Sequence, residues 1–78
     1  MSVSVGIQDG RAGAGYTVLL DEQAEATYVG KAAPNTSTST AAWQIRRIKQ
    51  VGSVLQVEYA DIGGFDQVWD DRAALTYS

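Results

Sequence analysis

Eight glycines punctuate a chain of only 78 residues, and runs rich in β-branched residues fill the intervals between them. Short apolar segments separated by glycine-containing turns are typical of small antiparallel β domains. The chain has no cysteine and no histidine, so neither a disulfide nor the commonest metal ligand can reinforce a thin core. We therefore expect residues 1–78 to form one small, mainly β domain, an antiparallel β-sandwich or partly open barrel of about five to six strands.

Apolar residues mark the candidate strands. Val3, Val5 and Ile7 alternate with small residues, and a glycine-rich loop over residues 10–15 follows them. Gly10, Gly13 and Gly15 lack the strand–loop–helix setting of a phosphate-binding loop, so we interpret them as a flexible connection. Further strand-like runs cover residues 16–20, 26–30, 54–60 and 74–77.

Residues 41–51 fit two periodicities. At a period of two, Trp43 and Ile45 share one face, and a bulge near Arg46 and Arg47 brings Ile48 back into phase. At helical spacing, apolar residues recur every third position, with Thr40 and Gly52 as caps. We favour the strand, because a compact hairpin through residues 50–53 then leads into the alternating run at 54–60.

Residues 61–72 combine a turn with the densest acidic group of the chain. Asp61 to Gly64 has turn composition, and Asp66 could cap a helical turn over residues 66–72 that buries Phe65 and Trp69. Asp61, Asp66, Asp70 and Asp71 lack the spacing of a calcium loop, so we expect a cap and an ion pair with Arg72. Tryptophan in a small domain belongs in the core by default, and we assign Trp43 and Trp69 to it.

Composition excludes several classes of function. A net charge of −3 opposes nucleic-acid binding, and Arg46, Arg47 and Lys49 beside Trp43 form too small a basic group to reverse this. No apolar run approaches the roughly 20 residues of a membrane span, and the first residues lack the features of a signal peptide. Without histidine, cysteine or a catalytic motif we expect no enzyme activity, cofactor, metal or small-molecule ligand.

The first eight residues suggest an assembly role. Val3, Val5 and Ile7 lie ahead of the glycine-rich loop, so residues 1–8 could form an arm that adds a strand to a neighbouring subunit. They could equally form the first strand of the chain's own sheet. Both interpretations remain open at this point.

From Tyr28 onward the layout resembles short virion-associated structural proteins of tailed bacteriophages. The resemblance rests on residues 28–34, a serine- and threonine-rich stretch, residues 42–48, residues 59–61 and residues 65–78. In sequence these read Tyr28-Val-Gly-Lys-Ala-Ala-Pro34, Ala42-Trp-Gln-Ile-Arg-Arg-Ile48, Tyr59-Ala-Asp61 and Phe65-Asp-Gln-Val-Trp-Asp-Asp-Arg-Ala-Ala-Leu-Thr-Tyr-Ser78. It implies a virion location, with synthesis in the host cytoplasm, and brings no catalytic motif.

We therefore expect a non-enzymatic virion structural protein, a capsid decoration (cement) protein or a head–tail or tail component. Its partners would be copies of itself and a major capsid or tail protein, bound through β pairing and apolar contacts. Val3, Val5 and Ile7 are the candidates for pairing. Arg46, Arg47 and Arg72 are the candidates for polar contacts at the rim. The alternative is a host-surface or glycan-binding module with Tyr28, Trp43 or Trp69 exposed for stacking.

Overall fold

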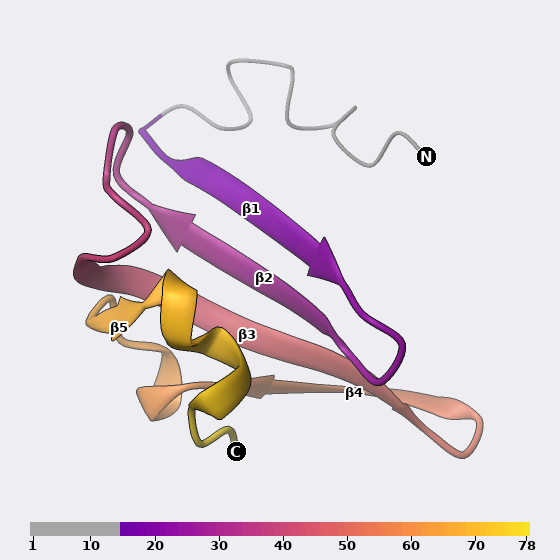
Figure 1. Ribbon diagram of the computed structural model, residues 1–78. Helices are drawn as coiled ribbons and strands as arrows, with labels where there is room; N and C mark the ends of the chain where they lie inside the picture. Colours follow the sequence, from indigo (N-terminus) through magenta and orange to yellow (C-terminus); the bar gives the residue numbers. More distant parts are fainter. Residues whose placement is uncertain (1–14) are drawn as a thin grey trace.

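The computed structural model describes residues 15–78, which form an antiparallel meander followed by a short return segment (Figure 1). Strands β1, β2, β3 and β4 lie side by side in chain order, and β5 pairs with β3 beyond the end of β4. Two 3₁₀ helices, η1 and η2, lie before and after β5. The elements are β1 (Thr17–Glu22), β2 (Thr27–Ala32), β3 (Ala41–Val51), β4 (Val54–Tyr59), η1 (Asp61–Gly63), β5 (Gln67–Val68) and η2 (Trp69–Ala74).

Residues 41–51 are a strand, as favoured from the sequence. A two-residue turn joins β3 to β4, with Val51 opposite Val54 and Gly52 at φ 65°. A positive φ at the first turn residue suits the right-handed twist of a hairpin and favours glycine there. The register irregularity lies between Ala41 and Trp43 in the pairing with β5, so the bulge expected near Arg46 and Arg47 is wrong. Residues 46–51 pair with β4 without interruption.

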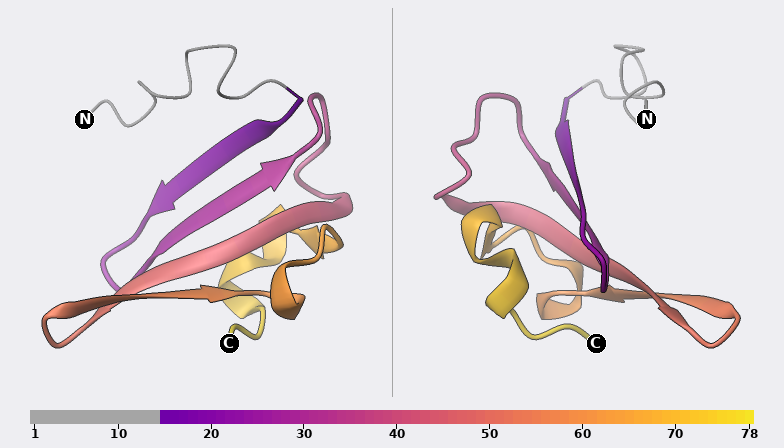
Figure 2. Two further views of the ribbon diagram at one scale, coloured as in Figure 1. Left: turned by 180° about the vertical axis from the view of Figure 1, so that it is seen from behind. Right: turned by 45° about the vertical axis from the view of Figure 1, so that its right-hand side comes forward.

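One face of the sheet, here called the core face, carries the hydrophobic core. Trp43 and Ile45 of β3 are fully buried, as is Ala32 of β2. Trp69 of η2 and Tyr77 pack against them on this same face. Figure 2 shows η2 lying over this side of the sheet. The assignment of both tryptophans to the core is confirmed, and the indole N–H of Trp43 donates to the Ser37 carbonyl at 3.0 Å.

The helical turn expected over residues 66–72 occurs slightly later, as η2. Trp69 is buried as expected, but Phe65 is 44% exposed, so the predicted burial of both rings is wrong. Val68 occupies the N-cap position and no side chain caps the helix. Asp66 is therefore not the cap, because β5 separates it from the helix.

The end of the chain closes the core without forming a regular strand. Residue 74 is helical, and Tyr77 forms an isolated bridge to Ala60, so the strand expected over 74–77 is wrong in extent. Ser78 and Tyr59 exchange two backbone hydrogen bonds of 3.1 Å. These bonds fix the terminus to the outer edge of β4.

The mainly β, antiparallel class with five strands is confirmed. Across residues 15–78 the strands do not close into a barrel. The expected first strand, with Val3, Val5 and Ile7, lies outside the described residues, as does most of the glycine-rich loop.

Candidate functional site

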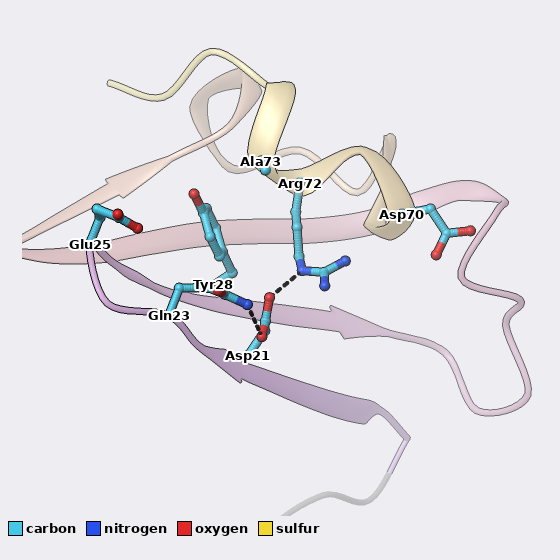
Figure 3. A pocket seen from close by; sticks show the side chains of 7 residues that line it. All are labelled: Asp21, Gln23, Glu25, Tyr28, Asp70, Arg72 and Ala73. Carbon is cyan, nitrogen blue, oxygen red and sulfur yellow. Dashed lines mark hydrogen bonds and ion pairs between the residues drawn. The ribbon is translucent and has the colours of Figure 1, made fainter.

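A hollow of about 320 Å³ opens between β1 and η2 on the core face (Figure 3). Arg72 Nε donates to Asp21 Oδ2 at 2.8 Å, and Gln23 Nε2 donates to Asp21 Oδ1 at 2.8 Å. These hydrogen bonds hold the pKa of Asp21 below its usual value. The Arg72 guanidinium also lies 4.5 Å from the centre of the Trp69 ring. Both charged groups already have partners. We therefore interpret the Arg72–Asp21 ion pair as a structural link between β1 and η2, and not as a ligand site.

A second charged cluster lies on the same face at β3 and β4. Arg47 donates from Nε and Nη2 to Glu58 Oε1, and Lys49 Nζ lies 3.8 Å from the same oxygen. The hydrogen bonds from Arg47 lower the pKa of Glu58. The Arg47 guanidinium lies 4.6 Å from the ring centre of Tyr77, whose hydroxyl donates to the Arg72 carbonyl at 2.7 Å. Burial raises the pKa of Tyr77 from 10.0 to about 12, so the phenol stays protonated at pH values where an exposed tyrosine ionises.

Asp61 and Asp66 form a carboxyl pair beside η1. The hydrogen bond between the two carboxyl groups and the charge of Asp66 raise the pKa of Asp61. The same hydrogen bond, together with the one donated by the Gln67 amide, lowers the pKa of Asp66. Both side chains belong to exposed residues. Within residues 15–78, no group of three or more acidic side chains is placed to hold a metal ion.

The opposite face of the sheet, here called the outer face, carries a row of apolar residues. The register places Leu20 beside Val29 and Ile48 beside Val57. Leu55 is next to Val57 on the same face, because residues two apart in a strand point the same way. Leu20, Val57 and Leu55 are 39%, 51% and 67% exposed.

The β3–β4 hairpin carries four of the eight exposed large apolar residues in the described chain, although Ile62 of η1, at 92%, is individually the most exposed. It extends beyond the β1–β2 turn (Figures 1 and 2), and Val51 and Val54 at its tip are 51% and 61% exposed. A shallow hollow of about 600 Å³ separates it from the β1–β2 turn, with Ile48 and Leu55 on its wall. Of the described helices, η2 packs on the core face, and η1 lies at the far end of β4, near Gln44. The hairpin tip is therefore an apolar surface with no described helix against it.

An exposed aromatic pair lies at the other end of the outer face. Tyr16 and Phe65 stack with ring centres 5.9 Å apart, and Lys31 Nζ lies 4.5 Å from the Tyr16 ring centre. The two rings are 45% and 44% exposed. Phe65 therefore contributes to a surface, although the sequence placed it in the core.

The structure places Arg47 and Arg72 on the core face, where both contact Tyr77, and Arg46 on the outer face. Arg47 and Arg72 are engaged in ion pairs within the chain, and Arg72 pairs with Asp21 instead of the acidic group around Asp70. Arg46 is one residue away from Arg47 along β3 and so faces the outer side. Trp43 and Trp69 are too deeply buried to present a stacking surface, and Tyr28 is half-buried against Tyr77.

Sequence reasoning missed the β3–β4 hairpin as a candidate surface. The alternation over residues 54–60 puts Leu55, Val57 and Tyr59 on one face, and the register confirms this, but alternation does not indicate which of the three side chains solvent reaches. The sequence feature that could have indicated this surface is the absence of any charged residue from position 50 to position 57. Edge strands in natural proteins usually carry such charges.

Comparison with known proteins identifies no relative: no family model, no curated protein and no solved structure matches the chain. In the part that the structure describes, no helix has the length and apolar character to cross a membrane.

Proposed function

We propose that the chain is a non-enzymatic structural protein of a bacteriophage virion, either a capsid decoration (cement) protein or a small head–tail or tail component. It acts by β pairing and apolar contact with copies of itself and with a major capsid or tail protein. The observation that carries the proposal is the exposed segment of residues 50–57 in the β3–β4 hairpin, which carries no charge. The phage setting comes from the sequence resemblance over residues 28–78.

Exposure of the hairpin supports assembly as its role. Val54, Leu55 and Val57 are each more than half exposed along an edge strand. Contiguous apolar surface on a small soluble domain commonly marks a contact site for another protein. A partner that binds only the folded state also stabilises it, which suits a domain with a small core. Contact through the hairpin would thus serve both attachment and stability.

The charged clusters support a non-enzymatic role. Asp21 with Arg72, and Glu58 with Arg47, satisfy each other's hydrogen-bonding groups. Catalytic acids and bases instead need a pKa near the working pH and access to a substrate. The shifts at Asp21 and Glu58 run the other way, because both carboxyls are held in the ionised form.

The alternative, a host-surface or glycan-binding module, now depends on different residues. Burial of Trp43 and Trp69 leaves the stacked pair of Tyr16 and Phe65 as the described aromatic surface that could contact a sugar. Changes in the NMR signals of these two rings on addition of oligosaccharides would favour this module. Unchanged ring signals across a panel of host glycans would remove it.

Binding to particles tests the proposed function. Tailed-phage particles that lack this chain would be mixed with the purified protein and recovered by sedimentation. We expect the full chain to co-sediment at a saturable occupancy, and Leu55→Lys to lower that occupancy. Ala33→Lys is the matched control, since it adds the same charge at an exposed position outside the hairpin. Absence of binding by the full chain would contradict the proposal.

The amino-terminal arm is tested with the same particles. Deletion of residues 2–8 is expected to leave a folded protein with reduced occupancy, because Val3, Val5 and Ile7 would no longer pair with a neighbouring sheet. Unchanged occupancy of this deletion variant would overturn the role of the arm and leave the hairpin as the attachment surface.

A further inference from the structure

β4 has one edge that does not pair with β3, and its bonds to Ser78 show which backbone groups point to that edge. The N–H and C=O of Tyr59 both bond to Ser78, so they point away from β3. Alternate residues of an antiparallel strand direct their backbone groups to the same side. The N–H and C=O groups of Leu55 and Val57 therefore point to the same side as those of Tyr59.

This edge lacks the features that normally prevent strands from pairing with other chains. Natural edge strands carry charges, prolines or bulges that block such pairing. β1, the other edge of the meander, ends in Asp21 and Glu22. The first four residues of β4, Val54 to Val57, contain no charge, no proline and no register irregularity, and all of them are exposed.

We infer that β4 pairs with β4 of a second copy of this chain, antiparallel and across a twofold axis. This inference rests on the proposed function, because it names one partner and one interface for the assembly role. A twofold contact uses the same surface on both copies, so the edge must complement itself. β4 meets this condition, since the two residues whose backbone groups point away from β3, Leu55 and Val57, both have apolar, neutral side chains.

The position of Ser78 limits the register of this pairing. Ser78 already occupies the edge beside Tyr59, so the second strand can extend only as far as Glu58. Residues directly opposite each other must also share a face of the sheet. The longest pairing that meets both conditions sets Leu55 against Val57 of the second copy, with Gln56 on the axis. Leu55 and Val57 then exchange backbone hydrogen bonds in both directions.

The side chains are compatible with this register. On the outer face, Leu55 and Val57 of the two copies form one continuous apolar group. On the other face, the Gln56 side chains lie opposite each other, and Glu58 lies opposite Val54. No like charges are opposed, and Glu58 keeps its bonds to Arg47. The two meanders would join into one continuous sheet.

A cysteine at the axis tests the register. In the inferred dimer the two copies of residue 56 form a pair without backbone hydrogen bonds, with Cα atoms about 4.5 Å apart. That spacing lies within the range of disulfides. Because the chain has no cysteine, Gln56→Cys should give a single disulfide-linked dimer under mild oxidation. Gln50→Cys is the matched control, an exposed glutamine of the same hairpin on β3. Equal rates of cross-linking for the two variants would overturn the register.

Sedimentation across a concentration series tests the dimer itself. Val57→Lys places a charge opposite Leu55 of the second copy and diagonal to the same substituted position of that copy. Because the substitution acts at both symmetric positions, the dissociation constant should rise about tenfold or more. Val51→Lys is the matched control, because Val51 and Val57 are both 51% exposed and only Val57 lies at the inferred interface. Equal weakening by both variants, or a monomeric wild type at every concentration, would overturn the inference.

A backbone variant separates strand pairing from simple apolar contact. Leu55→Pro removes an N–H that points away from β3, so the hairpin is expected to fold while the dimer loses two hydrogen bonds, one from each copy. A dimer unaffected by this change would contradict strand pairing. Particle binding is measured separately. A protein that binds particles but stays monomeric would support the proposed function and contradict the inferred dimer.

Discussion

The indole of Trp69 lies directly against Gly30, where β2 carries no side chain. A Cβ atom at Gly30 would overlap ring atoms Cε3 and Cζ3 of Trp69 and lie 3.2 Å from Cε3 of Trp43. The two indole rings have centres 6.0 Å apart and are tilted by 42°. Gly30 thus lets η2 approach the sheet closely enough for both tryptophans to share one core.

Gly30→Ala is expected to lower the free energy of unfolding by about 1–3 kcal/mol, because the added methyl group overpacks the core. Chemical denaturation followed by far-UV circular dichroism measures this change. Gly64→Ala is the control, since its added Cβ would meet the exposed side chains of Asp66 and Asp61 at 3.2 and 3.3 Å. We expect an effect within about 0.5 kcal/mol there. Equal effects of the two variants would contradict the role of Gly30.

The Arg72–Asp21 pair is expected to make stability depend on pH in the acid range. The native pKa of Asp21 lies below its ordinary value of 3.8, so the pair contributes fully above that pH. As pH falls through 3.8 toward the lower native pKa, the unfolded chain takes up the proton first and the contribution is lost. Asp21→Asn should therefore be less stable than wild type at neutral pH, with a difference that shrinks on acidification. Denaturation curves from pH 6 to pH 2 measure it, and a constant difference would contradict this account.

Tyr77 is expected to make the fold sensitive to alkaline pH. An unfolded tyrosine ionises near 10, whereas burial raises the pKa of Tyr77 to about 12 in the native state. The unfolded chain thus releases its proton first, and stability falls as pH rises from about 10 to 12. Tyr77→Phe should abolish this fall, and it should lower the free energy of unfolding at neutral pH by about 0.5–1.5 kcal/mol through the lost bond to Arg72. Titration of phenolate absorbance checks the pKa, and no absorbance step near 12 would contradict it.

Burial of both tryptophans predicts blue-shifted fluorescence that iodide quenches weakly. Trp43 and Trp69 are only 1% and 6% exposed, so quencher reaches them poorly until the chain unfolds. The measurement compares native protein with protein in denaturant. Emission and quenching that match the denatured chain would show that the core differs from the one described.

The strands and the tryptophan core could be predicted because local patterns determine them. Alternation over residues 54–60 and the turn residue Gly52 indicated the hairpin, and the hairpin in turn favoured a strand for 41–51. The position of the bulge could not be predicted, because it depends on β5, a two-residue strand with no pattern of its own.

The contacts of the charged and aromatic residues were harder to predict. Arg72 pairs with Asp21, 51 positions away in the sequence, whereas nearer carboxylates offered a local partner. Phe65 and Trp69 have helical spacing, but β5 interrupts the helix between them and leaves Phe65 beside Tyr16. Such pairings depend on the path of the whole chain, so local sequence does not determine them.

Residue-resolved amide exchange most directly tests the claim that the free edge of β4 pairs with a second copy of the chain. The amides of Gln56 and Glu58 point toward β3 and should exchange slowly at every protein concentration. The amides of Leu55 and Val57 should exchange quickly in dilute protein and slowly in concentrated protein, as dimers form. Rapid exchange of Leu55 and Val57 at all concentrations, with Gln56 and Glu58 protected, would show that the hairpin folds but does not pair, and would contradict the claim.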